Sequence, residues 1–207
     1  MRNDDLLLII DVQRDFCPGG QLEVPDGDAV VPLINRLSVH FEHIILTQDW
    51  HPASHTSFAS NHSGVQPFEQ ITLEYGPQTL WPDHCVQGAE GADFHPDLEI
   101  TRAELILRKG FRPAIDSYSA FLENDKRTAT GLAGYLRERD IRRIFLTGLA
   151  YDYCVRFSAV DAVHLGFEAV VIQDACRPIS AIAETEEEFA RVGVKLITAA
   201  ELLAAGQ

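Results

Sequence analysis

The chain has little positive charge: 17 lysine and arginine residues stand against 31 acidic residues, for a formal net charge of −14. Without a basic stripe to meet phosphates, nucleic acid is not expected as a partner. Long apolar runs are also missing. The stretch Leu6–Ile10 is too short for a signal peptide or a membrane span, so we expect a cytoplasmic protein with no membrane partner.

Cysteine is scarce as well, with four residues in 207. A cytoplasmic chain keeps its thiols reduced, so a disulfide framework is not expected and a thiol is free to act as a nucleophile. A glycine-rich phosphate-binding fingerprint is absent from the end of the first apolar run, where Asp11-Val-Gln13 stands instead. This absence argues against a nucleotide-binding α/β protein without catalytic activity.

Short apolar runs rich in β-branched residues alternate with amphipathic segments. The expected strands are 6–10, 44–47, 105–107, 144–147, 169–172 and 194–197, and the expected helices are 30–41, 129–136, 155–163 and 184–192. This alternation predicts an α/β fold, with helices on both faces of a mostly parallel central sheet of about six strands. We expect one domain over residues 1–207. A long irregular region at about 49–97 breaks the rhythm, which is typical of a functional loop.

Reactive side chains follow the ends of these expected strands: Asp11, Asp49 with His51, Lys109, Cys154 and Asp174. In an open parallel sheet, ligands bind beyond the carboxyl ends of the strands. An acid, a pair of metal-ligand type, a base and a thiol are therefore expected at one rim.

Cys154 follows a strand and a short loop, and a helical pattern begins at or beside it. A helix N-terminus favours a thiolate, and its N–H groups can bind an oxyanion. The alternative is an ordinary small buried residue. Asp11 ends an apolar strand and needs a partner, for which Lys109 is the candidate. The two form either a structural ion pair or a general acid/base beside the thiol, where the lysine favours negative charge on both groups.

Asp49 and His51 lie two residues apart, so in an extended segment they face the same side. An Asp and a His presented together suit a divalent ion, with a further ligand from His55, His62 or His84. Aromatic residues near these segments are either core residues or the walls of a pocket for a flat ring. They are Phe16, Trp50, Phe58, Trp81, Tyr118 and Phe121.

Five segments resemble motifs of the nicotinamidases, in the isochorismatase-like hydrolase superfamily. They are Asp11-Val-Gln-Arg-Asp-Phe16 with Pro18-Gly-Gly, Gln48-Asp-Trp-His-Pro52, Trp81-Pro-Asp-His-Cys-Val-Gln-Gly88, Lys109-Gly110 and Gly148-Leu-Ala-Tyr-Asp-Tyr-Cys-Val155. The cysteine motif alone marks the superfamily, and its combination with the two metal segments is specific to nicotinamidases. The resemblance implies the isochorismatase-like αβα fold and hydrolysis of nicotinamide, and also of pyrazinamide, through a cysteine thioester.

The resemblance also implies roles for individual residues. Cys154, Asp11 and Lys109 would form the catalytic triad; Asp49, His51 and His84 would bind one divalent metal; Ala150 and Cys154 would form the oxyanion hole; Phe16, Trp81, Tyr118, Leu149 and Ala150 would bind the substrate. The Leu149–Ala150 peptide would be cis. The metal would be zinc, or else iron or manganese, and the partner a small amide, with a homo-oligomer also compatible.

Two positions depart from the family pattern. Ser57 stands where some members have a further metal histidine, so water or Ser57 would complete the shell, with His55 behind it. Tyr151 stands where a threonine is common, and we expect its side chain to face away from the thiol. The alternatives left open are a metal-free cysteine hydrolase of the superfamily acting on another amide, and a hydrolase in which metal-activated water attacks while Cys154 is inert.

Overall fold

A single parallel sheet organises the chain. The computed structural model describes residues 1–205, so the expected domain end at residue 207 lies outside the described residues. Six strands lie in the order β5-β2-β1-β6-β7-β8, and each neighbouring pair is parallel. The strands are β1 (Asp5–Ile10), β2 (His43–Asp49), β5 (Leu105–Lys109), β6 (Arg143–Leu149), β7 (Glu168–Arg177) and β8 (Lys195–Ile197). The expected α/β sheet of about six strands is confirmed.

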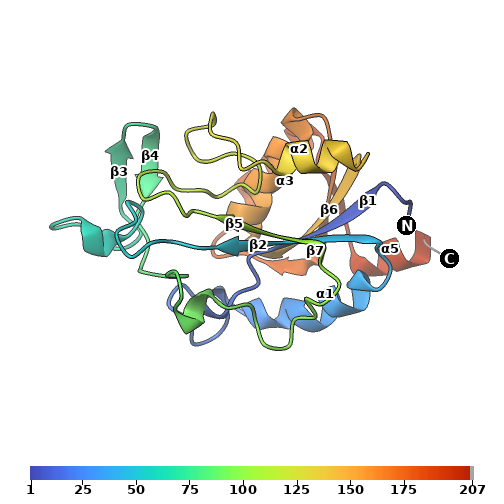
Figure 1. The fold of residues 1–207 in the computed structure, drawn as a ribbon, viewed down its shortest axis with the longest axis horizontal. Coiled ribbons are helices and arrows are strands. Elements are labelled where there is room, and N and C mark those ends of the chain that lie inside the picture. The colour runs from blue at the N-terminus through green and yellow to red at the C-terminus, as the bar shows by residue number, and fades with distance from the viewer. Residues whose placement is uncertain (206–207) are drawn as a thin grey trace.

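Helices cover both faces of this sheet, as Figure 1 shows. Two of them, α1 (Val31–Ser38) and α5 (Ala199–Ala205), lie on one face. The opposite face carries α2 (Leu132–Glu138), α3 (Arg156–His164) and α4 (Ala183–Val192). This is the expected three-layer arrangement. No helix among residues 1–205 is both long and apolar enough to pass through a bilayer.

The two cores follow directly from the pattern of the central strand. Successive side chains of a strand point to opposite faces. In β1, Leu7 and Ile9 pack with α1 and α5, whereas Leu6, Leu8 and Ile10 pack with α2, α3 and α4. Because both faces are covered, β1 is apolar at every position except its first, as a buried parallel strand requires.

The strand order reverses beside β1, and this fixes where a ligand can bind. From β1 the chain proceeds outward through β2 to β5, and then returns to place β6 on the other side of β1. A crevice therefore forms beyond the carboxyl ends of β1 and β6. Ile10 and Gly148 are register partners there, so Asp11 emerges beside the end of β6. Asp49 and Lys109 are register partners at the ends of β2 and β5.

Several local expectations were wrong. The region at about 49–97 contains an antiparallel hairpin of β3 (Gln70–Leu73) and β4 (Gly76–Thr79), which projects from the end of the molecule opposite the termini (Figure 1). The helix α5 was not anticipated. Asp174 does not follow the fifth strand, because β7 continues past it to Arg177. Its carboxylate instead accepts a hydrogen bond from the N–H of Ala199, at the start of α5.

Candidate active site

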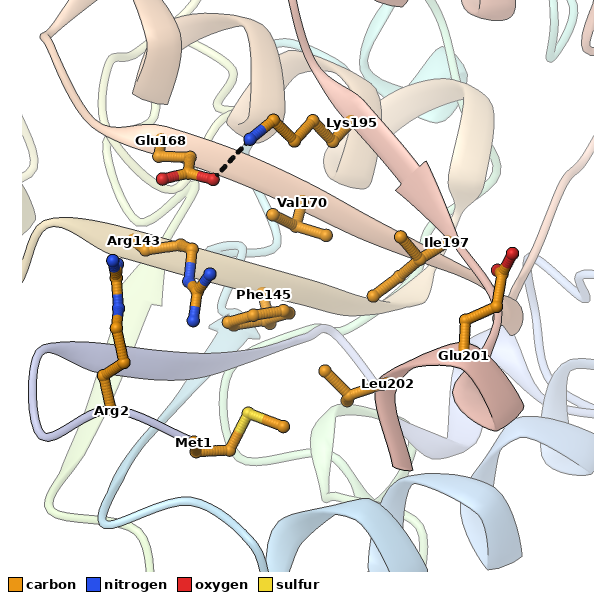
Figure 2. Close-up of a pocket in the computed structure, with 10 residues that line it drawn as sticks. All are labelled: Met1, Arg2, Arg143, Phe145, Glu168, Val170, Lys195, Ile197, Glu201 and Leu202. Atoms are coloured by element: carbon orange, nitrogen blue, oxygen red, sulfur yellow. Dashed lines mark hydrogen bonds and ion pairs between the residues drawn. The ribbon is translucent and has the colours of Figure 1, made fainter. Parts of the chain in front are cut away.

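Two hollows lie at opposite rims of the sheet. The larger, of about 530 Å³, lies where the strands begin and is drawn in Figure 2. Its cations are already paired: Lys195 Nζ lies 2.7 Å from Glu168, and Arg143 lies 2.7 Å from Asp5. The smaller cavity, of about 30 Å³, lies at the carboxyl rim and is lined by Asp49, His51, His84 and Cys154, among others. The expected nucleophile and the expected metal ligands therefore meet at the smaller cavity.

Lys109 stands at the centre of this rim site. Its fully buried ammonium nitrogen lies 2.7 Å from Asp11 Oδ2 and 2.5 Å from Asp49 Oδ1. It also donates to the carbonyl oxygen of Ser117 at 3.0 Å and lies 3.4 Å from Cys154 Sγ. One cation thus joins the candidate acid, the candidate metal ligand and the candidate nucleophile.

The two carboxyl groups around Lys109 have opposite proton affinities. Burial raises the pKa of Asp11, and the nearby charge of Asp49 adds to this, although Lys109 opposes it. Burial acts in the same direction on Asp49, but Lys109 and His51 outweigh it and hold the pKa of Asp49 below its usual range. When their surroundings shift the pKa values of two neighbouring groups in opposite directions, one group is suited to proton transfer and the other stays ionised. Asp11 is the carboxyl suited to take up a proton, and Asp49 the one suited to stay charged.

Cys154 lies in one turn of π-helix, Tyr151–Val155, that leads into α3. Burial raises the pKa of its thiol well above the ordinary value, and Lys109 offsets this only in part. Lys109 favours the thiolate, as expected, but desolvation of the buried anion outweighs this effect, so the thiol holds its proton more strongly than a free cysteine does. A protonated thiol needs a base, and Asp11 and Cys154 present atoms within 4.8 Å of each other.

Backbone carbonyls fix the tautomers of the two histidines expected to bind metal. His51 Nδ1 donates to Gly110 O at 2.8 Å, and His84 Nδ1 donates to Pro82 O at 2.7 Å. The Nε2 atoms then carry lone pairs, and they lie 3.5 and 3.9 Å from Asp49 Oδ2. Burial and the neighbouring His51 lower the pKa of His84 to about 4, so its imidazole is neutral at pH 7. Two oriented imidazoles and one carboxylate oxygen fit a divalent cation of the zinc type.

Ser57 and His55 form a pair behind these ligands. The N–H of Ser57 donates to His55 Nδ1 at 3.2 Å, and the Ser57 hydroxyl lies 2.7 Å from the same nitrogen. Because Nδ1 accepts a hydrogen bond, His55 carries its proton on Nε2, which faces the carbonyl oxygen of Ile115 at 3.3 Å. The rings of His55 and His51 are 4.4 Å apart. His62 bonds to the carbonyl of Thr56 and is not among the residues that line the cavity.

The cavity has an aromatic wall. Phe16, Trp81 and Tyr118 line it together with Ala150, which are positions that the resemblance implied for substrate binding. Leu149 packs into the core on the α1 side, and the Leu149–Ala150 peptide is cis. Trp50, Phe58 and Phe121 are not among the residues lining the cavity.

Some residues of the site were missed by the sequence analysis. Leu22, Asp116, Tyr153 and Ile179 also line the cavity. Leu22, Asp116 and Ile179 come from loops whose course cannot be inferred from strand periodicity, and Tyr153 comes from the π-helical turn that holds Cys154. Tyr151, in contrast, packs against Phe189 of α4 and so faces away from the thiol, as expected.

Gln13 was also missed, although its position gave a signal. Its fully buried amide accepts from the N–H of Asp49 at 2.8 Å and donates to the carbonyl of Asp49 at 2.8 Å and to that of Ala92 at 2.9 Å. A glutamine just beyond an apolar strand must find such partners. It holds the backbone of Asp49 in place.

A family model described as the isochorismatase domain matches residues 5–201. Among characterised relatives, the chain is 49% identical over 204 residues to a nicotinamidase of Acinetobacter baylyi, covering 97% of this chain and 95% of the relative. It is 45% identical over 203 residues to the nicotinamidase of Escherichia coli, covering 94% and 95%.

Solved structures agree with these relatives. An Acinetobacter baumanii nicotinamidase/pyrazinamidase superposes with a TM-score of 0.96 at 50% identity, covering 98% of this chain and 99% of the other. PnC1 of L. infantum, in complex with nicotinate, superposes with a TM-score of 0.85 at 37% identity, covering 97% and 96%. The pyrazinamidase of Pyrococcus horikoshii, in complex with zinc, gives a TM-score of 0.75 at 34% identity, covering 94% and 99%.

Proposed function

The chain belongs to the isochorismatase family, and we propose that it is a nicotinamidase, which hydrolyses the carboxamide of nicotinamide to nicotinate and ammonia. The observation that carries this is the meeting of Cys154 Sγ, Lys109 Nζ and the Asp11 carboxylate beside the buried group Asp49–His51–His84. Relatives at 49% and 45% identity over nearly their whole length are nicotinamidases, which supports the same substrate here.

Asp49, His51 and His84 would hold one divalent metal, with zinc favoured by the two imidazoles and supported by the zinc complex of a pyrazinamidase relative. When bound, the metal supplies an electrophilic anchor for a ring nitrogen of the substrate. Lys109 neutralises one oxygen of Asp49 and leaves Oδ2 directed toward the histidines. The aromatic wall, which includes Phe16 and Trp81, then confines a flat ring.

The pocket must widen to admit the substrate. Its free volume of about 30 Å³ is close to the volume of one water molecule in the liquid. Tyr118 and Tyr153 line both this pocket and an adjoining hollow of about 280 Å³, so their movement would join the two. Closure around the ring then excludes bulk water from the thiol, which strengthens every electrostatic interaction in the site.

Acylation begins with proton transfer. Asp11 accepts the proton of the Cys154 thiol while the sulfur attacks the carboxamide carbon, and a C–S bond forms. The N–H groups of Ala150 and Cys154 stabilise the oxyanion, with each such donor worth about 3 kcal/mol. Asp11 then gives its proton to the departing nitrogen, the C–N bond breaks, and ammonia leaves a thioester behind.

Deacylation reverses the proton transfers. Asp11 removes a proton from a water molecule, whose oxygen attacks the thioester carbon. The C–S bond breaks, and Asp11 returns the proton to Cys154 as nicotinic acid is released and ionises. Lys109 lies close to both acid and sulfur throughout, so it limits the cost of the negative charge that passes between them.

The test is ammonia release from nicotinamide by the purified protein, with and without a metal chelator. We expect turnover that the chelator removes and zinc restores, and slower or comparable turnover of pyrazinamide. Absence of ammonia release from nicotinamide by metal-loaded protein would contradict the proposal. Activity that persists after alkylation of Cys154 would favour attack by metal-activated water instead.

A further inference from the structure

One buried carboxylate of the pocket has no role in the reaction described above. Asp116 is 2% exposed and, apart from Asp49, is the one carboxylate among the residues that line the cavity. Among residues 1–205 no lysine or arginine forms an ion pair with it. Gln78 Nε2 donates to its Oδ2 at 2.7 Å, and the N–H of Ser117 donates to its Oδ1 at 2.8 Å.

Asp116 lies close to the histidines of the expected metal site. One of its oxygens is within 4.8 Å of a ring nitrogen of His51 and of a ring nitrogen of His55. A carboxylate has about four lone-pair positions, so the two bonds from Gln78 and Ser117 leave it acceptor capacity toward the cavity. Its negative charge is thus available to a cation held by Asp49 and the histidines.

The formal charges show why such a countercharge is needed. Asp11, Asp49 and Lys109 together leave one net negative charge in a fully buried cluster. Adding a divalent cation, with neutral imidazoles and a protonated thiol, changes this to one net positive charge. An unbalanced charge is costly away from water. The carboxylate of Asp116 returns the metal-bound site to neutrality.

Asp116 is also joined to the wall of the ring pocket. Gln78 Nε2 lies 3.1 Å from Tyr118 Oη, and Trp81 Nε1 donates to the same oxygen at 3.2 Å. Gln78 is 1% exposed and comes from β4, so the hairpin delivers the group that orients the carboxylate. This explains why a hairpin far from the central sheet bears on the site.

We propose that Asp116 is a positioning residue, the countercharge that makes this buried site neutral when it holds a divalent metal. The proposal rests on the metal site of the proposed function. It predicts that a neutral residue at position 116 weakens metal binding without weakening the metal-free fold. In the absence of metal, Asp116 adds a further negative charge to a site that is already net negative, so without it the metal-free protein should melt at the same temperature or higher.

The experiment measures Zn²⁺ affinity by competition with a chelating dye, and the melting temperature of chelator-treated protein. For Asp116→Asn we expect Zn²⁺ binding about 10- to 100-fold weaker than wild type. Glu123→Gln is the matched control, since it removes a carboxylate that is 1% exposed in the same loop but is paired with Arg112. It should bind Zn²⁺ as wild type does.

A ligand variant, Asp49→Asn, separates this inference from the proposed function. If Asp49→Asn loses Zn²⁺ while Asp116→Asn keeps wild-type affinity, the countercharge role is wrong and the metal site stands. If Asp49→Asn keeps Zn²⁺, the metal site itself is wrong. A lower melting temperature of metal-free Asp116→Asn would show a structural role instead. Should that variant not fold, Asp116→Glu against Asp116→Gln gives the same charge comparison, and equal Zn²⁺ affinity of the two overturns the proposal.

Discussion

Lys109 Nζ lies 2.7 Å from Asp11 Oδ2, although both groups are completely buried. The same nitrogen is 2.5 Å from Asp49 Oδ1, so one cation serves two carboxylates with different tasks. The register of β2 with β5 sets this geometry, because it places Lys109 directly beside Asp49 at the ends of the strands. The proton acceptor and the metal ligand are therefore coupled through a single side chain.

Replacing this lysine should damage stability and activity together. Lys109→Met leaves two buried carboxylates without the cation that they share, and we expect the free energy of unfolding to fall by about 3–5 kcal/mol. Lys195→Met is the control: its ion pair with Glu168 is largely exposed, so the change should be about 0.5 kcal/mol or less. Urea unfolding checks both values, and similar losses for the two variants would contradict the account.

The nucleophile can be tested against a second buried cysteine. Cys154→Ala should lower ammonia release from nicotinamide by about 10⁴-fold or more, because the thioester can no longer form. Cys176→Ala removes a sulfur that lies on β7 and is not among the residues lining the cavity, so its turnover should stay near wild type. Equal turnover of wild type and Cys154→Ala would rule out the nucleophile assignment.

Much of the fold could be predicted because the central strands of the sheet are buried on both faces. Continuous apolar runs such as Leu6–Ile10 are typical of strands in a covered parallel sheet, and α4 ends at Val192, the end expected for the helix 184–192. The hairpin β3–β4 could not be predicted in the same way. Its residues are mostly exposed or half-buried, and many are polar, so neither periodicity nor hydrophobicity distinguishes them from a loop.

The residues brought together at the rim could be predicted in part, because strand ends must converge in a parallel sheet. Asp11, Asp49 and Lys109 meet for this reason. The protonation state of Cys154 could not be predicted from the sequence. The pKa of its thiol depends on burial and on the distance to Lys109, and both require a structure. Asp116 was missed because the loop that holds it is ordered by Gln78, from a hairpin that the sequence did not reveal.

Thr47 supports the proposed base. Its hydroxyl donates to Asp11 Oδ1 at 2.6 Å and accepts from the N–H of Asp11 at 3.2 Å, and the threonine is fully buried. Thr47→Val should lower the free energy of unfolding by about 2 kcal/mol, since a hydrogen bond to a charged group is lost. It should also raise the pKa of Asp11 further and move the acid limb of the pH–rate profile upward.

Thr147 offers the matched control on β6. It is equally buried, but within residues 1–205 no partner for its hydroxyl oxygen is found. Thr147→Val replaces an unpaired hydroxyl by a methyl group of the same shape, so stability should be unchanged or slightly higher. Chemical denaturation of both variants measures the difference, and a larger loss at position 147 than at position 47 would refute the argument.

The start of β1 should make stability depend on pH. Arg143 donates to both oxygens of the buried Asp5, at 2.8 and 2.7 Å, and the N–H of Arg2 donates at 2.6 Å. Burial raises the pKa of Asp5, but the bonds from Arg143 and Arg2 outweigh it, so the pKa is lowered overall. The folded state thus binds this proton less readily than the unfolded state does. The stabilisation is complete above about pH 4 and disappears as pH falls through the lowered pKa.

Asp5→Asn should therefore be less stable than wild type by about 2 kcal/mol at pH 7. The difference should shrink on acidification, because wild type loses the same charge when Asp5 is protonated. Melting temperatures of both proteins from pH 7 to about pH 2 measure this difference, since the range extends below the ordinary carboxyl pKa of about 4. A difference that stays constant or grows toward low pH would contradict the assigned direction.

Gly110 links the backbone of the lysine strand to a metal ligand. It has φ +67°, where side chains other than glycine are strained, and a Cβ there would overlap the ring of His51. Its carbonyl also accepts the bond from His51 Nδ1 that fixes the tautomer. Gly110→Ala should cost more than about 1 kcal/mol in stability and weaken Zn²⁺ binding, since the ring of His51 must move.

Gly134→Ala is the control: this glycine is exposed in α2 with open space around it, so alanine should stabilise the fold by about 1 kcal/mol and leave Zn²⁺ binding unchanged. Loss of stability at position 110 with full Zn²⁺ affinity would mean that His51 is not held by this backbone, and the tautomer argument for the metal site would then fail.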